Sequence, residues 1–159
     1  MFETVEREHE VLLVEDNPAD ARLTLEGFRE GGLPARLRVV GDGTEAMAVL
    51  RREGGHGDAA RPSLVLLDLN LPGADGFEIL GRLKADPVLQ SIPVVVLTSS
   101  EAPGDVQRAY SLRANCYVTK PDDLPQFLSV IQSIGEFWLA VVRLPPKGPP
   151  AVPGCTNRP

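Results

Sequence analysis

The sequence predicts an α/β fold: one five-stranded, doubly wound parallel sheet with five helices on its two faces. Short apolar runs alternate with longer segments of helical periodicity through most of the chain. Runs such as 63–67 are apolar without alternation, which is typical of strands that are buried on both faces. Parallel strands need long crossover connections, and the helical segments between the runs supply them.

The expected strands are short runs rich in Val and Leu. The second run, 35–40, alternates apolar residues with Arg36 and Arg38, which indicates one wetter face and a place at the sheet edge. We expect strands at residues 10–15, 35–40, 63–68, 93–98 and 116–119.

The expected helices carry recognisable start and stop signals. Asn17 suits the N-cap of the first helix and Pro18 its first turn, whereas Gly31 and Gly32 end it. Pro87 ends the third helix. We expect helices within residues 17–32, 44–53, 76–86, 104–113 and 124–144.

The length predicts a single domain. The chain has 159 residues, which fits one core with terminal extensions. We interpret residues 1–8 as an N-terminal extension and 9–144 as the folded domain. Residues 145–159 are rich in proline, and we expect this tail to be disordered.

Composition excludes several classes of function. The net charge of −6 and the pI near 4.9 argue against sequence-independent binding to nucleic acid or to an anionic membrane. The two cysteines, Cys116 and Cys155, do not form a disulfide or zinc pattern. The first residues are too charged for a signal peptide, and no apolar run is of transmembrane length. We therefore expect a cytoplasmic protein.

Carboxylates follow two of the expected strands. Glu15 and Asp16 end the first strand, and Asp68 ends the apolar run 63–67. In open α/β sheets, ligands bind outside the carboxyl ends of the strands, so these side chains should lie together. Three anions repel one another unless a cation neutralises them, and oxygen ligands of this kind suit Mg²⁺.

Two other strand exits complete the predicted site. Thr98 ends the fourth strand and Lys120 follows the fifth. A hydroxyl group and a mobile ammonium group beside carboxylates and a metal ion could bind a phosphoryl oxygen.

These residues resemble the receiver domain of bacterial response regulators, which has a flavodoxin-like fold. The resemblance spans roughly residues 9–143, and any one of its motifs alone would be weak. The matching stretches are VLLVEDNPAD, LVLLDLNLPGADGFEIL, PVVVLTSS and YVTKP, in the order of the family.

The resemblance implies that Asp68 is the phosphoacceptor of a two-component phosphorelay, phosphorylated by a histidine kinase. Asp16 and Asp68 would bind Mg²⁺ directly, together with the backbone carbonyl of Asn70. Glu15, which stands where the family often has Asp, would act through water. Such a protein signals through a phosphorylation-dependent change of its surface and is not an enzyme, although it assists its own phosphotransfer and dephosphorylation.

The resemblance also assigns the other strand exits. Thr98 would bond the phosphoryl group, Lys120 would pair with it, and a cis peptide would precede Pro121. Tyr117 would be the switch aromatic, which turns inward when Thr98 moves towards the phosphate. Asn70 and Ser100 would tune the lifetime of the phosphate.

Two alternative functions compete with this interpretation. A Mg²⁺-dependent phosphohydrolase of haloacid-dehalogenase type also uses an aspartate nucleophile, but it usually has D-x-D where this chain has DLN at 68–70. A flavodoxin-type flavin protein is disfavoured because the acidic loop 15–20 would repel a phosphate.

The last expected helix carries more apolar residues than one packing face needs. Two stripes run along 124–144, and this surplus predicts a homodimer or partner interface; the alternative is one wide core stripe with the tail folded back. The residues proposed for it are Phe137, Trp138, Val141 and Val142. The ending FWLAVVRLPP and the opening EDNPADARL resemble the small single-domain receivers that pair with phytochrome-type histidine kinases, so we expect such a kinase as partner.

Overall fold

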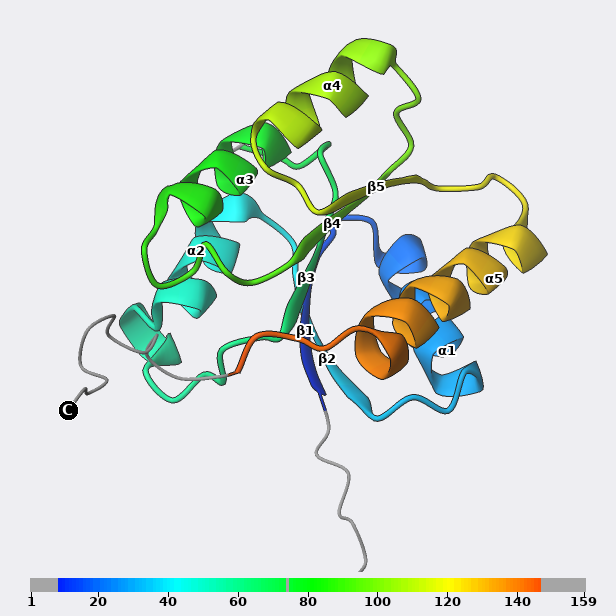
Figure 1. Ribbon diagram of the computed structural model, residues 1–159, viewed down its shortest axis with the longest axis horizontal. Coiled ribbons are helices and arrows are strands. Elements are labelled where there is room, and N and C mark those ends of the chain that lie inside the picture. Colours follow the sequence, from blue (N-terminus) through cyan, green and yellow to red (C-terminus); the bar gives the residue numbers. More distant parts are fainter. Residues whose placement is uncertain (1–8, 74, 147–159) are drawn as a thin grey trace, which may run out of the picture.

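The computed structural model describes residues 9–73 and 75–146. Its centre is a sheet of five strands, all parallel, in the order β2-β1-β3-β4-β5 (Figure 1). The predicted fold class is therefore confirmed. The strands are β1 His9–Val14, β2 Ala35–Val40, β3 Leu64–Leu67, β4 Val94–Thr98 and β5 Cys116–Thr119.

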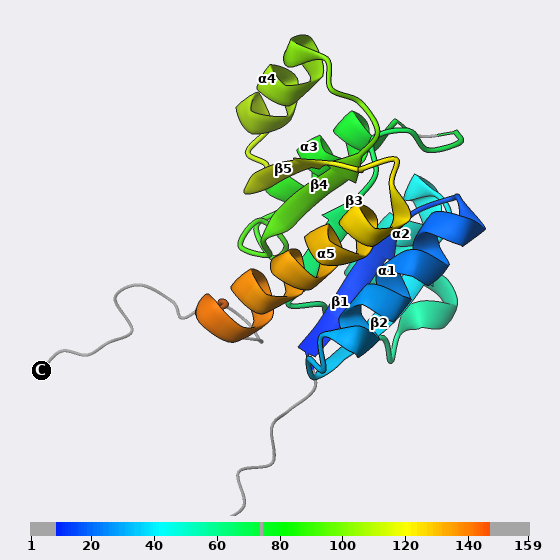
Figure 2. The ribbon, with the colours of Figure 1, turned by 90° about the vertical axis from the view of Figure 1, so that its right-hand side faces the viewer.

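The helices cover both faces of the sheet. Figures 1 and 2 show α1 and α5 on one face and α2 and α3 on the other, with α4 beyond β5 at the same side as α3. The helices are α1 Pro18–Glu30, α2 Gly43–Arg51, α3 Gly76–Ala85, α4 Pro103–Ser111 and α5 Leu124–Gly135. None of the described helices is long and apolar enough to cross a lipid bilayer.

The side chains of the central strands pack into two separate hydrophobic cores, one on each face of the sheet. Leu64 and Leu66 pack with the core under α1 and α5, whereas Val65 and Leu67 pack with the core under α2 and α3. All four side chains are fully buried. This two-sided burial explains why β3 is apolar without alternation. β2 is an edge strand, as predicted, and Arg36 and Arg38 are exposed on its wetter face. Val39, which the alternation places on the drier face, is exposed as well.

The chain order places a topological switch between β1 and β3. From β1 the chain passes to β2 on one side, and it then returns to β3 on the other side of β1. The connections that leave the carboxyl ends of β1 and β3 therefore diverge, and a ligand site is expected between them. Val14 is in register with Leu67, so the residues after them leave the sheet at the same level.

A glycine lets α3 begin directly against the end of β3. A Cβ atom on Gly76 would lie 2.5 Å from the Leu69 Cα and 2.6 Å from the Asp68 carbonyl oxygen. Both contacts are with backbone atoms, which cannot move aside cheaply. The backbone around Asp68 is thus fixed by the packing of the next helix.

The last helix differs from the prediction. The sequence predicts one helix over 124–144, but α5 ends at Gly135 and a π-helix follows at Glu136–Val141. The wider π turn carries Leu139 into the core and leaves Trp138 only partly buried, although regular α-helical spacing from Ile131 would bury Trp138.

The predicted terminal segments are only partly covered. The extension 1–8 and residues 147–159 of the predicted disordered tail lie outside the described residues. Pro145 and Pro146 are described and exposed.

Candidate functional site

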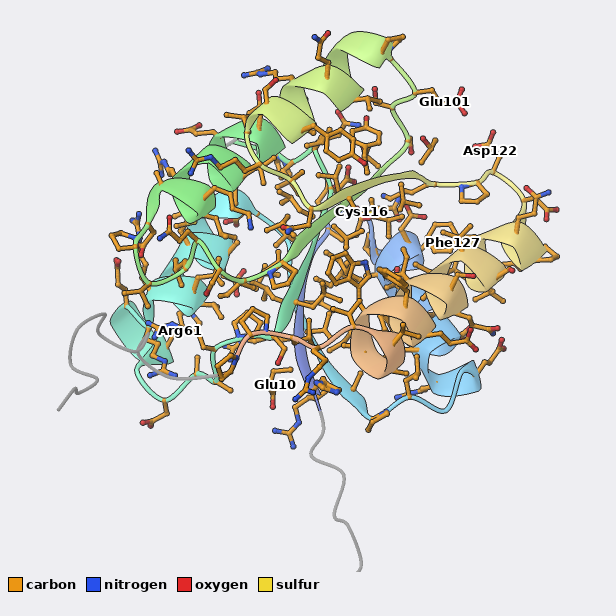
Figure 3. All side chains as sticks on the ribbon, viewed as in Figure 1. Glu10, Arg61, Glu101, Cys116, Asp122 and Phe127 are labelled. Carbon is orange, nitrogen blue, oxygen red and sulfur yellow. The ribbon has the colours of Figure 1, made fainter. Side chains whose placement is uncertain are left out.

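The carboxylates predicted to meet at the end of the sheet do so. Glu15 and Asp16 follow β1, Asp68 follows β3, and each offers an oxygen within 4.8 Å of the others. Glu15 and Asp68 are buried, at 3% and 6% exposure, whereas Asp16 is exposed. Figure 3 shows Glu101 and Asp122 at this end of the molecule, on the loops that leave β4 and β5.

Lys120 joins this cluster from the loop after β5. Its Nζ atom donates hydrogen bonds to Asp68 Oδ2 at 3.0 Å, to Asp20 Oδ2 at 2.9 Å and to Glu15 Oε1. Lys120 is only 8% exposed. Buried charges are tolerated when they are paired and hydrogen-bonded, and this lysine meets both conditions.

Burial and pairing raise the pKa values of Glu15 and Lys120, but burial acts in opposite directions on the two groups. Burial raises the pKa of Glu15 to about 7, although the ammonium of Lys120 acts against this rise and the charge of Asp68 adds to it. Burial acts to lower the pKa of Lys120, but its hydrogen bonds to Glu15 and Asp20 outweigh burial and raise the pKa above its usual range. Lys120 is therefore always charged at neutral pH, and the site holds more negative than positive charge.

Thr98 presents a buried hydroxyl group without a partner. The residue is 0% exposed, and its Oγ1 atom has no hydrogen-bond partner among the described residues. Buried hydroxyl groups nearly always have a partner, and an exception calls for an explanation such as a ligand. Thr98 ends β4, the neighbour of β3 in the sheet, so its hydroxyl group is available to an oxygen bound at this edge.

The turn after β3 orients the Asp68 carboxylate. The backbone N–H of Asn70 donates to Asp68 Oδ1 at 3.1 Å, while Lys120 holds Oδ2. Both oxygens of Asp68 are thus fixed by hydrogen bonds. The Asn70 side chain is exposed.

The residues present fit a divalent cation and a phosphoryl group. Three carboxylate oxygens gathered within 4.8 Å are hard ligands of the kind that Mg²⁺ and similar ions prefer. The unpartnered hydroxyl of Thr98 and the ammonium of Lys120 are the donors that phosphoryl oxygens need. The arrangement can therefore accept a phosphoryl group on Asp68.

Tyr117 lies in β5 and is hydrogen-bonded to the loop after β4. Its hydroxyl group donates to the Ser100 carbonyl oxygen at 2.9 Å, and the side chain is half-buried. The Ser100 hydroxyl lies 2.5 Å from Asp105 Oδ2 in α4. This network links β5, the loop after β4 and α4.

One backbone expectation is wrong. No peptide bond between described residues is cis, so Lys120 and Pro121 are joined by a trans peptide. Trans is the lower-energy isomer even before proline.

The predicted interface residues lie away from the carboxylates, on the π-helix and the residue after it. Phe137 is 52% exposed and Val141 70%, whereas Trp138 and Val142 are partly buried. The rings of Phe137 and Trp138 meet edge to face at 5.5 Å between centroids. Among the four residues that the sequence grouped together, Phe137 and Val141 therefore point outward, whereas Trp138 and Val142 are partly covered.

Asp20 is the site residue that the sequence did not single out. It lies in the first turn of α1 and brings a third carboxylate to Lys120. Its place in the acidic stretch 15–20, four residues after Asp16, was the available signal.

Comparison with known proteins gives the same family throughout. Residues 11–132 match the family model described as the response regulator receiver domain. The response regulator Rcp1 of Synechocystis sp. is 45% identical over 135 residues, which are 85% of this chain and 92% of that protein. A probable methanogenesis regulatory protein, FilR2 of Methanothrix harundinacea, is 42% identical over 135 residues, 85% of this chain and 86% of that protein.

Solved structures agree with the sequence relatives. The crystal structure of the phosphorylated cyanobacterial phytochrome response regulator RcpA matches with a TM-score of 0.85 and 47% identity, covering 87% of this chain and 99% of that one. The Mn²⁺-bound form of Rcp1 matches with a TM-score of 0.84 and 44% identity over the same shares. Fold, site geometry and relatives converge: this chain belongs to the response-regulator receiver family and is similar to phytochrome response regulators.

Proposed function

We propose that this protein accepts a phosphoryl group on Asp68 from a histidine kinase and signals through the resulting change of its surface. The observation that carries the proposal is the contact between Lys120 and Asp68, made at a buried strand end beside the carboxylates of Glu15 and Asp16. An oxygen of Asp68 attacks phosphorus, the bond from phosphorus to the donor nitrogen breaks, and the nitrogen leaves with its electron pair.

Each surrounding residue supports this transfer. Lys120 is positioned to pair with the phosphoryl oxygens, and Thr98 offers them its free hydroxyl group. Asn70 holds the Asp68 carboxylate through its backbone N–H. Phosphorylation adds a charge of about −1.5 to −2, which must be balanced inside the cluster.

A divalent cation would supply that balance, and we propose Mg²⁺. Asp16 and Asp68 would hold it directly, with the Asn70 carbonyl, and Glu15 would act through water. The clustered carboxylate oxygens support this assignment, and so does the similarity to Rcp1, whose crystal structure is a Mn²⁺-bound form. The bound ion would neutralise charge as the phosphoryl group arrives.

The phosphohydrolase alternative is not supported. The family match is to a receiver domain. Asn70 also stands where that class of enzyme has a second aspartate. An amide cannot serve as a general acid, so the phosphorylated form should persist rather than turn over rapidly. We therefore propose a phosphoprotein that assists its own phosphotransfer and dephosphorylation.

The proposed donor is a phytochrome-type histidine kinase. Support comes from the relatives, since RcpA is a phytochrome response regulator and another similar structure is the bacteriophytochrome response regulator AtBRR, at 41% identity and a TM-score of 0.69. No role in binding nucleic acid or membranes is proposed, because the net charge of −6 disfavours both. A cytoplasmic location remains part of the proposal.

A homodimer through the end of the last helix is also proposed. Exposed apolar residues lie there, with Phe137 at 52% and Val141 at 70% exposure. A surface pocket beside them is lined by Cys116, Val118, Val130, Ile134, Phe137 and Trp138, together with Ser129 and Ser133. An apolar patch of this kind suits a second copy of the chain.

Phosphorylation with acetyl phosphate and Mg²⁺ tests the central proposal. The wild type should gain one acid-labile phosphate, seen as a mass increase, and the Asp68→Asn variant should gain none. Asp58→Asn is the matched control, because Asp58 is exposed and lies between α2 and β3, away from the site. An unlabelled wild type, or equal labelling of Asp68→Asn, would refute the proposal. Steady phosphatase turnover would instead favour the enzyme.

A further inference from the structure

We propose that Asp20 is a positioning residue that holds the ammonium group of Lys120 beside Asp68. The inference rests on the proposed function, since it concerns the lysine that would pair with the phosphoryl group. Asp20 Oδ2 lies 2.9 Å from Lys120 Nζ, and the Asp20 side chain is 26% exposed. The contact is a charge-assisted hydrogen bond, which is the strong kind.

Asp20 differs from the other two carboxylates that Lys120 contacts. Glu15 and Asp68 belong to the group that could hold a metal ion, and Asp20 does not. A cation bound there would draw on the Glu15 and Asp68 carboxylates that accept from Lys120, and phosphorylation would change Asp68 itself. Asp20 is therefore the contact of Lys120 that neither the proposed metal ion nor the phosphoryl group would use.

The backbone of Asp20 is fixed well enough to serve as an anchor. Its N–H group donates to the Asn17 side chain at 3.2 Å, as part of the N-cap of α1. Its carbonyl oxygen accepts from the hydroxyl group of Thr24 at 2.8 Å. The helix in turn packs closely on α5, since a Cβ atom on Gly27 would lie 2.6 Å from an Ile131 methyl group. Asp20 is thus held in place by a packed helix, and its carboxylate can in turn hold the ammonium group of Lys120 in place.

Such an anchor matters because lysine is flexible. Ordering a free lysine side chain costs conformational entropy. A fixed carboxylate meets that cost before the phosphoryl donor arrives, which is how preorganisation accelerates transfer. Loss of Asp20 should therefore displace Lys120 from Asp68 and slow phosphorylation without unfolding the protein.

The composition of the chain allows a direct view of the lysine. The sequence has three lysines, Lys84, Lys120 and Lys147, so a protein labelled with ¹⁵N-lysine gives a simple ammonium spectrum by NMR. Lys84 is an internal control, because its buried Nζ atom donates to Gln90 O, Ile92 O and Asn115 Oδ1, away from the carboxylates. The spectra are recorded without metal for the wild type and for Asp20→Ala, Asp20→Asn and Asp122→Ala.

The Lys120 signal should shift in Asp20→Ala and shift less in Asp20→Asn, because the amide oxygen still accepts a hydrogen bond. Neither variant should move the Lys84 signal. Asp122→Ala removes an equal charge from an exposed position two residues after Lys120, on the same loop, and should leave both signals in place. A Lys120 signal that is unchanged in Asp20→Ala would overturn the inference.

Rates of labelling by acetyl phosphate at saturating Mg²⁺ give the second readout. Asp20→Ala should be slower by on the order of tenfold, within the hundredfold that a displacement of about 1 Å can cost. Asp20→Asn should be intermediate and Asp122→Ala equal to the wild type. Wild-type labelling by Asp20→Ala would overturn the inference while leaving the proposed function intact. If the wild type itself were not labelled, the proposed function would fail, and the Lys120 signal would still decide whether Asp20 holds the lysine.

Discussion

The Lys120 ammonium group lies 3.0 Å from an oxygen of Asp68, and both side chains are more than nine-tenths buried. The same ammonium also contacts Glu15 and Asp20. One cation therefore compensates several carboxylates that the fold forces together. Stability, pH response and phosphorylation should all depend on this balance.

Removing the cation should destabilise the protein in a way that Mg²⁺ repairs. Lys120→Met leaves buried carboxylates unpaired, which costs on the order of 3 to 5 kcal/mol when one partner of a buried pair is lost. We expect a lower free energy of unfolding at pH 7.5 in EDTA, measured with urea, and recovery of much of the loss on addition of Mg²⁺.

Lys84→Met is the matched control for this experiment. Lys84 is also buried, but its Nζ atom donates to two backbone carbonyls and the Asn115 amide. The variant should be destabilised without rescue by Mg²⁺. Equal rescue of both variants would contradict the assignment of Lys120 to the metal-linked cluster.

The stability of the metal-free protein should fall as pH rises from about 4.5 to about 7. The pKa of Glu15 is about 7 in the fold and 4.5 ordinarily, so between these values the folded state holds a proton that the unfolded chain releases. The loss in free energy of unfolding is absent below this range and complete above it, where it is at most roughly 3 kcal/mol. Urea unfolding in EDTA at pH 4.5, 6 and 7.5 measures it.

Glu15→Gln isolates the contribution of this carboxyl group. The variant cannot ionise at this position, so it lacks the loss of stability that the wild type shows with rising pH. Its free energy of unfolding should therefore increase relative to that of the wild type as pH rises through the same range. A difference between the two proteins that stays constant with pH would show that Glu15 titrates normally.

Thr98→Val should separate stability from phosphorylation. The Thr98 hydroxyl is buried without a partner among the described residues, so replacing it with a methyl group breaks no hydrogen bond. We expect the free energy of unfolding to change by about 1 kcal/mol or less, because an unsatisfied polar group is removed and no partner is left behind. Labelling by acetyl phosphate should nevertheless fall, whereas Thr98→Ser should retain it. Normal labelling of Thr98→Val would remove the hydroxyl from the proposed mechanism.

Phosphorylation should change the environment of Tyr117. The sequence has two tyrosines, Tyr110 and Tyr117, so a protein labelled with fluorotyrosine gives two ¹⁹F signals, and Tyr117→Phe assigns them. Beryllofluoride with Mg²⁺ should shift the Tyr117 signal as its hydroxyl leaves the Ser100 carbonyl. The Asp68→Asn variant should show no shift. A Tyr117 signal that is indifferent to beryllofluoride would contradict its role as the switch.

The proposed dimer should dissociate when charge is placed on the outward residues of the π-helix. Phe137→Asp with Val141→Asp changes residues that are more than half exposed, so the fold should survive. Sedimentation should give twice 17.1 kDa for the wild type and 17.1 kDa for the double variant. Val39→Asp is the control, since Val39 is 45% exposed on β2 at the far edge of the sheet. A wild type that stays monomeric at high concentration would contradict the dimer.

Much of the fold was predictable because its signals are local. The uninterrupted run at 63–67 predicted a strand that is buried on both faces, and Leu64 and Val65 indeed enter opposite cores. Asn17 and Pro18 predicted the start of α1, and Asn17 caps it through Ala19 N and Asp20 N. The end of the last helix was not predictable, because the apolar spacing of the sequence continues through 136–141, where the structure changes to π geometry.

The sequence by itself determined the sheet, its helices and which side chains leave its carboxyl edge, because apolar periodicity and chain order fix these. It therefore brought Glu15, Asp16, Asp68, Thr98 and Lys120 to one place. Only the tertiary structure decided which atoms meet. It showed that Lys120 donates hydrogen bonds to Asp20 as well as to Asp68, and that the Thr98 hydroxyl has no hydrogen-bond partner among the described residues. Contacts between side chains from distant segments depend on the packing of helices and strands, which no local pattern specifies.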